Sequence, residues 1–294
     1  MKIVLTGGTG FIGKNLMSKL YNDGYEIFCL VREKSVISDI NSGIQVVRYY
    51  AKKDLYRIME EIKPDVLVHL AGFFLNEHSK DNIEELVDSN ITFSTVLFDA
   101  ANKSGCKKIV NTSSYWKCYQ GDEYNPVNLY AATKRATEDI LIYYVKAHKW
   151  SVLNLIIFDV YGAKDKRSKL INIIHKMQNG ESIGLTGGEQ LLYFCYIDDV
   201  ISAYERAITM VQQQGALFKE YAIRSDEVYT LREILETYLH ISGKALVLNW
   251  GERTYKEREF MNPKNVGTIL EGWYPKYDLR QGLTKYCSES DIDG

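Results

Sequence analysis

Hydrophobic positions in the first half of the chain alternate between the spacing typical of strands and that typical of helices. Short apolar runs bounded by turn residues predict strands at 2–5, 26–31, 45–49, 65–72, 107–114 and 151–158. Apolar residues three and four positions apart predict helices at 11–22, 55–62, 83–104 and 129–148. Strands and helices that alternate with short connections are typical of a doubly wound parallel α/β sheet.

The alternation weakens after about residue 165, where shorter helices mix with short strands. The pattern there predicts helices at 168–178 and 231–240, and strands at 191–196, 220–223 and 246–249. We therefore expect a doubly wound (Rossmann) domain at 1–165, with a return segment near 190–210, and a smaller α/β lobe at 166–294. The last eight residues, CSESDIDG, are expected to fray.

Three of the four glycines in the sequence TGGTGFIGKNL stand three residues apart where the first strand passes into the first helix. Gly7 permits a tight bend, Gly10 lets the backbone approach a pyrophosphate, and Gly13 lets the helix pack close to the strand. A pyrophosphate at this turn would meet free N–H groups at the positive end of the helix dipole. The turn therefore predicts a dinucleotide site, and we expect Phe11 and Ile12 to belong to it.

The end of the second strand indicates which dinucleotide binds. NAD-binding folds place a carboxylate there for the ribose hydroxyls, whereas this chain has Arg32 at that position, with Lys34 and Ser35 beyond it. An arginine can hold the 2′-phosphate of NADP(H) with paired donors, so we favour NADP(H). The alternative is that Arg32 is a solvated surface charge. Asp54, after the third strand, is expected to accept a hydrogen bond from the adenine amino group.

The sequence YAATK places Tyr130 and Lys134 four residues apart, on one face of a predicted helix. A phenol is a poor proton exchanger near neutral pH, and we expect the Lys134 ammonium to lower the pKa of Tyr130. Ser114, at the end of the preceding strand, can bond a substrate carbonyl, although Ser113 and Thr112 compete for this role. Together these groups suit carbonyl reduction by a nicotinamide. Taken alone, Tyr130 and Lys134 could also be two residues on the same face of an ordinary amphipathic helix.

Composition narrows the partners and the compartment. The formal net charge is −2 with no basic block, so nucleic acid is a poor candidate partner. No apolar run approaches the ~20 residues that a membrane span needs, and no signal-peptide pattern precedes the first strand. The five cysteines lack metal-ligand spacing, so we expect no metal site and reduced thiols in a cytoplasmic protein.

These segments together resemble the extended short-chain dehydrogenase/reductase family, of the NAD-dependent epimerase/dehydratase type. Over nearly the whole chain, the resemblance rests on GGTGFIG, HLAG, Asn90, NTSS, YAATK, DVYGA and YIDDV. The second half is similar to the bacterial CDP-abequose and CDP-paratose synthases, which are 4-ketoreductases of CDP-3,6-dideoxyhexoses. This similarity lies in GGEQLLYFCYIDDVISAY and KEREFMNPKNVGTILEGWYP.

The resemblance implies a nucleotide-sugar enzyme with catalytic Ser114, Tyr130 and Lys134. It also implies that the first half holds the dinucleotide and that a nucleotide sugar is the substrate. Residues implied near the cofactor are Leu55, Leu70, Ala71, Tyr130 and Lys134, and those near the substrate are Ser114, Tyr115, Asp159 and Arg258.

Two positions depart from the pattern of the family. Leu192 stands where relatives usually place an arginine that grips the substrate diphosphate. Asp159 stands where many relatives carry asparagine, and a carboxylate would repel a phosphate. An atypical nucleotide or substrate therefore remains an alternative.

The same residues separate the possible reactions. Dehydratases of the family carry an acidic pair directly after the catalytic Ser/Thr, whereas Tyr115 and Trp116 follow Ser114, which argues against dehydration. Arg32 favours NADPH, which is consumed and released, and hence a reductase of the C4 keto group of a deoxy nucleotide sugar for surface polysaccharide. The alternatives are an NAD(P)-dependent nucleotide-sugar epimerase and a non-catalytic dinucleotide-sensing regulatory protein.

Relatives of this family often dimerise through two long helices, here 83–104 and 129–148. We therefore expect a homodimer, with Leu141, Tyr143 and Tyr144 either at its interface or in packing within the chain.

Overall fold

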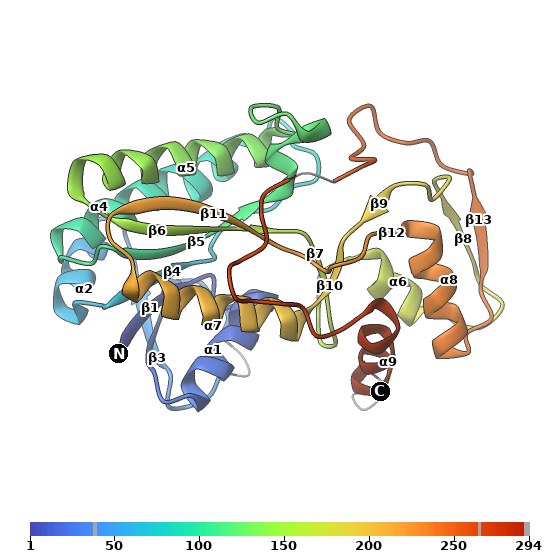
Figure 1. Ribbon diagram of the computed structural model, residues 1–294, viewed down its shortest axis with the longest axis horizontal. Helices are drawn as coiled ribbons and strands as arrows, with labels where there is room; N and C mark the ends of the chain where they lie inside the picture. The colour runs from blue at the N-terminus through green and yellow to red at the C-terminus, as the bar shows by residue number, and fades with distance from the viewer. Residues whose placement is uncertain (38–39, 264–265, 291–294) are drawn as a thin grey trace.

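The centre of the computed structural model, which describes residues 1–37, 40–263 and 266–290, is a seven-stranded sheet. The strand order is β11-β6-β5-β4-β1-β2-β3 and every neighbouring pair is parallel (Figure 1). Its strands are β1 (Lys2–Thr6), β2 (Glu26–Arg32), β3 (Gln45–Tyr49), β4 (Val66–His69), β5 (Lys108–Ser114), β6 (Ser151–Ile157) and β11 (Leu217–Ile223). The predicted doubly wound α/β sheet is confirmed.

Helices cover both faces of this sheet. α1 (Phe11–Asn22) and α7 (Ile197–Gln213) pack together on one face, and α2 (Asp54–Ile62), α4 (Phe93–Lys103) and α5 (Leu129–His148) lie on the other (Figure 1). Because successive strand residues point to opposite faces, Ile3 and Leu5 join the first apolar cluster while Val4 joins the second. This double burial explains the continuous apolar runs of the sequence.

The helix predicted at 83–104 is formed by three consecutive helical segments. They are α3 (Ile83–Val87), a π-helical turn (Asp88–Thr92) and α4. The turn buries Asn90, whose amide bonds the Phe73 backbone at 2.6 and 3.1 Å and Thr133 Oγ1 of α5 at 2.9 Å. This π-turn, of a kind frequent at functional sites, therefore ties α5 to the segment after β4.

A smaller lobe lies beyond the carboxyl ends of the strands, at the right of Figure 1. Its helices are α6 (Leu170–Lys176), α8 (Leu231–Ser242) and α9 (Leu279–Ser290). Its strands form three short pairs, which are β7 (Asp159–Tyr161) with β10 (Phe194–Tyr196), β9 (Leu191–Leu192) with β12 (Tyr229–Thr230), and β8 (Ser182–Leu185) with β13 (Val247–Trp250).

Several elements of the second half differ from the prediction. The strand expected at 220–223 within the smaller lobe is part of β11, which pairs with β6 along its whole length at the edge of the main sheet. Helix α7 was not predicted, and Tyr193 divides the strand expected at 191–196 into β9 and β10. The prediction that 287–290 fray is wrong, because they are helical in α9, whereas 291–294 lie outside the described residues.

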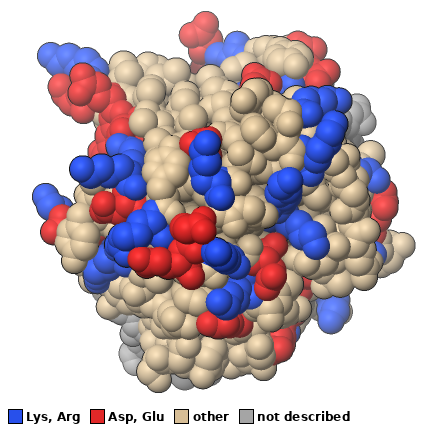
Figure 2. Space-filling view, turned by 90° about the vertical axis from the view of Figure 1, so that its left-hand side faces the viewer, with Lys and Arg blue, Asp and Glu red and all other residues tan. Residues whose placement is uncertain are grey.

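The surface features bear on the expected partners. Within the described ranges, no helix has both the length and the apolar character that crossing a membrane requires. On the side of the molecule shown in Figure 2, basic and acidic side chains are interspersed rather than gathered into a block of one sign. Of the residues considered for a dimer interface, Leu141 and Tyr144 are buried within the chain, and Tyr143 is exposed.

Candidate active site

A cavity of about 910 Å³ opens at the carboxyl ends of β1, β2 and β4. The chain runs from β1 outward to β2 and β3 on one side and continues with β4 on the other, so this is the switch point of the sheet. Open doubly wound sheets bind their ligands at such a point. Its wall is formed by 6–10, 30–35, 49–52, 70–73, Glu85, Asp88, Ser89 and Phe93.

The glycine turn forms the floor of this cavity, and its geometry requires glycine. Gly7 has a φ of 75°, and a Cβ on Gly13 would lie 2.2 Å from the Gly7 carbonyl oxygen. Gly10 is the N-cap of α1 and offers no side chain to bond the first N–H groups of the helix. The turn therefore has the close packing and the available N–H groups that a pyrophosphate requires.

The loop after β2 supplies cations to the same cavity. Arg32, Lys34 and Ser35 line the wall, and no carboxylate among the described residues forms an ion pair with Arg32. Arg48 of β3 donates to the carbonyl oxygens of Arg32, Glu33 and Ser35, at 3.3, 2.6 and 3.1 Å. These bonds fix the backbone at the end of β2, where Arg32 lies, and the loop that follows it.

Five of the residues that the sequence assigns to the dinucleotide line this cavity: Gly7, Gly10, Arg32, Leu70 and Ala71.

Gly13, Tyr130 and Lys134 are not part of the wall, and neither are four other residues predicted at the cofactor. One Asp54 carboxylate oxygen accepts the backbone N–H groups of Tyr50 and Ala51, at 3.0 and 2.8 Å, so it orders the wall instead of facing the cavity. Leu55 is buried in the core. The remaining two, Phe11 and Ile12, pack against the core on the α1 side of the sheet.

The predicted catalytic pair lies at the start of α5, next to one end of this cavity. Asn128 caps the helix by accepting the Ala131 N–H at 2.9 Å. Lys134 is buried, its Nζ donates to the Thr112 carbonyl oxygen at 3.2 Å, and a Cβ on Gly72 would lie 3.0 Å from that Nζ. Because Gly72 belongs to the cavity wall, the ammonium adjoins the cavity.

The three hydroxyls at the end of β5 have different partners. Thr112 Oγ1 bonds the Tyr204 hydroxyl at 2.7 Å, and Ser113 Oγ donates to Glu138. Ser114 is half-buried and its Oγ accepts the Trp116 N–H at 3.3 Å. Since an acceptor bond leaves the hydroxyl proton free, Ser114 can still donate to a ligand.

Burial sets the protonation of the catalytic pair. It raises the pKa of Tyr130 to about 12, with Arg167 opposing the shift. It lowers the pKa of Lys134 to about 8, with the Glu138 carboxylate opposing the shift. The expected net lowering of the Tyr130 pKa is therefore wrong for this structure, since desolvation of the phenolate outweighs the attraction of nearby cations.

The residues expected at the substrate are engaged with the chain itself. The Tyr115 hydroxyl donates to Asp159 at 2.8 Å, and its ring stacks on Phe158 at 4.7 Å. Arg258 donates to the carbonyl oxygens of Val127 and Pro126, at 3.2 and 3.0 Å, and to the Asn125 side chain. In this structure Arg258 therefore holds the segment before α5.

Sequence reasoning missed a buried ion pair beside the catalytic residues. Lys117 and Glu138 have side chains that are 1% exposed and contact each other at 2.9 Å. The spacing of Tyr130, Lys134 and Glu138 at intervals of four could have revealed that Glu138 shares the catalytic face of α5. No pattern in the sequence indicates the partner, Lys117.

Curated relatives resemble the chain over almost its whole length. The CDP-abequose synthase of Salmonella muenchen is 29% identical over 293 residues, which cover 98% of this chain and 97% of the relative. The CDP-abequose synthases of Salmonella typhimurium and Yersinia pseudotuberculosis are 26% and 28% identical and cover 96% and 90% of this chain. The aligned residues cover 95% of the Salmonella typhimurium protein and 92% of the Yersinia pseudotuberculosis protein.

Solved structures share the fold at lower identity. The UDP-glucose 4-epimerase of Thermotoga maritima, solved with UDP-glucose, superimposes with a TM-score of 0.82 at 22% identity and covers 100% of this chain and 99% of its own. The UDP-glucose 4-epimerase of Thermus thermophilus, solved with NAD, gives 0.80 at 21% identity, with 99% of each chain covered. The model of the NAD dependent epimerase/dehydratase family matches residues 3–220, so the chain belongs to this family.

Proposed function

We propose that the chain is an NADPH-dependent reductase of the C4 keto group of a deoxy nucleotide sugar in surface polysaccharide precursor synthesis. The sugar is a CDP-, dTDP- or GDP-linked 4-keto-6-deoxy or 3,6-dideoxyhexose. The observation that carries the proposal is the Tyr130–Lys134 pair, whose ammonium adjoins the cavity at Gly72 and donates to the carbonyl oxygen of Thr112, two residues before Ser114. The full-length similarity to CDP-abequose synthases supports the substrate class.

Each catalytic residue has a role that its environment supports. A bound NADPH supplies the hydride, and the glycine turn and the Arg32 loop would hold it. Tyr130 keeps its proton near neutral pH and donates it to the oxygen of the carbonyl that is reduced. Ser114 donates a hydrogen bond to the same oxygen and thereby orients the carbonyl, while the Lys134 ammonium favours the negative charge that proton donation leaves on Tyr130.

The preference for NADPH rests on the cations of the cavity wall. Arg32 forms no ion pair with a carboxylate among the described residues, and Glu33, Lys34 and Ser35 follow it in the wall. A guanidinium binds the 2′-phosphate through charge-assisted bonds, so NADPH should bind at least about tenfold more tightly than NADH. Titrations of wild type and Arg32→Gln test this, and the variant should lose most of the difference. Arg57→Gln, which removes an exposed arginine outside the wall, should keep it.

The preference for a deoxy sugar rests on two aromatic rings at the catalytic residues. Phe74 is 52% exposed, and its ring lies 4.9 Å from that of Tyr130 and 5.6 Å from that of Trp116. Trp116 follows Ser114 by two residues. A sugar carbon without its hydroxyl loses no hydrogen bond against such apolar surfaces, whereas a hydroxyl there would be desolvated.

The decisive experiment is turnover of purified protein with NADPH and each of the CDP-, dTDP- and GDP-linked 4-keto-6-deoxyhexoses and 4-keto-3,6-dideoxyhexoses. Stoichiometric NADPH oxidation with formation of a C4 hydroxyl supports the reductase, and Tyr130→Phe should abolish it while still binding NADPH. Epimerisation of an alcohol substrate without added reductant would instead establish the epimerase. Tight dinucleotide binding without any turnover would favour the regulatory alternative.

A further inference from the structure

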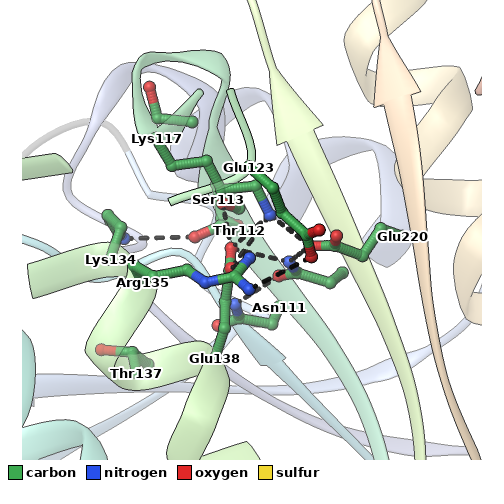
Figure 3. Close-up of polar contacts among 12 residues, drawn as sticks. Asn111, Thr112, Ser113, Lys117, Glu123, Lys134, Arg135, Thr137, Glu138 and Glu220 are labelled. Carbon is green, nitrogen blue, oxygen red and sulfur yellow. Dashed lines mark hydrogen bonds and ion pairs between the residues drawn. The ribbon is translucent and has the colours of Figure 1, made fainter. Parts of the chain in front are cut away.

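A buried ionic cluster connects the catalytic helix to the strand that carries Ser114 (Figure 3). Lys117 Nζ donates to both carboxylate oxygens of Glu138, each at 2.9 Å, and also contacts Glu220 of β11. Arg135 of α5 approaches Glu138 at 3.3 Å. The cluster thus joins two cations and two anions from three elements.

Neutral groups complete the coordination of the two carboxylates. Asn154 of β6 donates to Glu138 at 2.8 Å and to Glu220 at 2.7 Å, and Ser113 of β5 donates to Glu138. Such a network in a low-dielectric interior is costly to break and has few alternative geometries. It therefore specifies one arrangement of β5, β6, β11 and α5.

The position of the cluster relates it to the proposed reaction. Glu138 lies one helical turn after Lys134 and two turns after Tyr130, on the same face of α5. Lys117 lies in the short 3₁₀ turn that directly follows Ser114. The Lys117–Glu138 contact therefore joins the helix that carries the proton donor to the turn that follows the second hydroxyl.

We propose that Lys117 and Glu138 are positioning residues for the carbonyl reduction. Their ion pair fixes α5 against the turn after Ser114 and so sets the separation of the Tyr130 and Ser114 hydroxyls. This inference rests on the proposed function, because only a reaction that uses both hydroxyls depends on their separation.

Glu138 also acts on the charge of Lys134. Its carboxylate raises the pKa of Lys134 against the effect of burial. The charged groups that face Glu138 are Lys117 from the turn after β5, Glu220 from β11 and Arg135 from its own helix. Near Lys134, His69 of β4 is buried and neutral, because burial and the ammonium lower its pKa to about 3.

The test compares four variants of the full chain: Glu138→Asp, Glu138→Gln, Lys117→Met and Lys117→Arg. Glu138→Asp keeps the negative charge on a shorter side chain, so the ion pair with Lys117 should hold α5 in a shifted position. Because misplaced catalytic groups lower the rate, kcat should fall about tenfold, while KM for NADPH stays unchanged. Glu138→Gln removes the carboxylate that raises the pKa of Lys134, so the activity should be lost at a lower pH than in wild type. Lys117→Met should lower kcat similarly, and Lys117→Arg should recover most of it.

Lys285→Met is the control, since it removes an ion pair between α9 and Asp198 at the start of α7 and should leave kcat unchanged. Melting temperatures are measured in parallel, and the two conservative variants keep the test possible if Lys117→Met fails to fold. A lower melting temperature with unchanged kcat and pH profile would overturn the positioning role alone. Absence of reduction by wild type would overturn the proposed function and this inference together.

Discussion

At the scale of single residues, burial controls the chemistry more than sequence spacing does. The four-residue interval brings Tyr130 and Lys134 onto one face, as predicted, but it says nothing about how much water reaches either group. In the structure the Lys134 ammonium donates to the Thr112 carbonyl oxygen, and the Tyr130 ring packs against Phe74. The phenol therefore stays protonated and the ammonium becomes the group that titrates near physiological pH.

This assignment predicts the pH dependence of reduction. Lys134 is charged below its pKa of about 8, so the rate should be constant at lower pH. As the pH rises through about 8, the rate should fall as expected for the loss of a single proton from Lys134. Tyr130, with a pKa of about 12, remains a proton donor over this range and adds no loss of its own. Initial rates of NADPH oxidation at saturating substrate measure the profile, and a rate that increases above pH 8 would contradict the assignment.

At the scale of elements, the sequence predicts what local periodicity encodes. The strands of the main sheet other than β11 follow from short apolar runs, which are buried on both faces except in the edge strand β3, and helices α1, α2 and α5 follow from apolar stripes. Helix α7 has such a stripe, with Ile197, Val200, Ile201 and Tyr204 all buried, and could have been predicted. The strand pairs of the smaller lobe could not be predicted in this way. Strand β8 is too short to show a period, and its partner β13 lies some 65 residues later in the chain, since Val247 pairs with Ser182.

The glycine turn is the element whose prediction is easiest to test. In Gly13→Ala the new Cβ would lie 2.2 Å from the Gly7 carbonyl oxygen, which is backbone and cannot move aside without displacing α1. We expect about 1–3 kcal/mol lower stability, as overpacking costs, and at least tenfold weaker NADPH binding. Thermal melting and NADPH titration measure both effects.

Gly215→Ala is the matched control for this variant. A Cβ there would meet no atom within 4 Å, and the position has no positive φ, so neither stability nor binding should fall. If Gly13→Ala binds NADPH as tightly as this control, the dinucleotide does not depend on the glycine turn.

At the scale of the whole molecule, a segment of the smaller lobe at 251–261 reaches across to the main domain. Lys256 forms an ion pair with Glu77, Arg258 bonds the carbonyl oxygens before α5, and the Phe260 ring lies 5.1 Å from that of Tyr115. The sequence could single out Arg258 through its motif. The sequence could not show that the guanidinium already donates to backbone carbonyl oxygens before α5, since this contact joins residues more than 130 positions apart.

The two roles of Arg258 predict different results for Arg258→Met. If the guanidinium mainly fastens the segment, its loss should speed chymotrypsin cleavage within 251–261, because local opening becomes easier. KM for the nucleotide sugar should then rise together with the cleavage rate, while NADPH affinity stays unchanged, since the cavity wall does not include the segment. Arg253→Met, in the same exposed segment, is the control and should change neither. A rise in KM without faster cleavage would instead mean that Arg258 leaves the carbonyl oxygens and binds the substrate diphosphate, as the family resemblance implies.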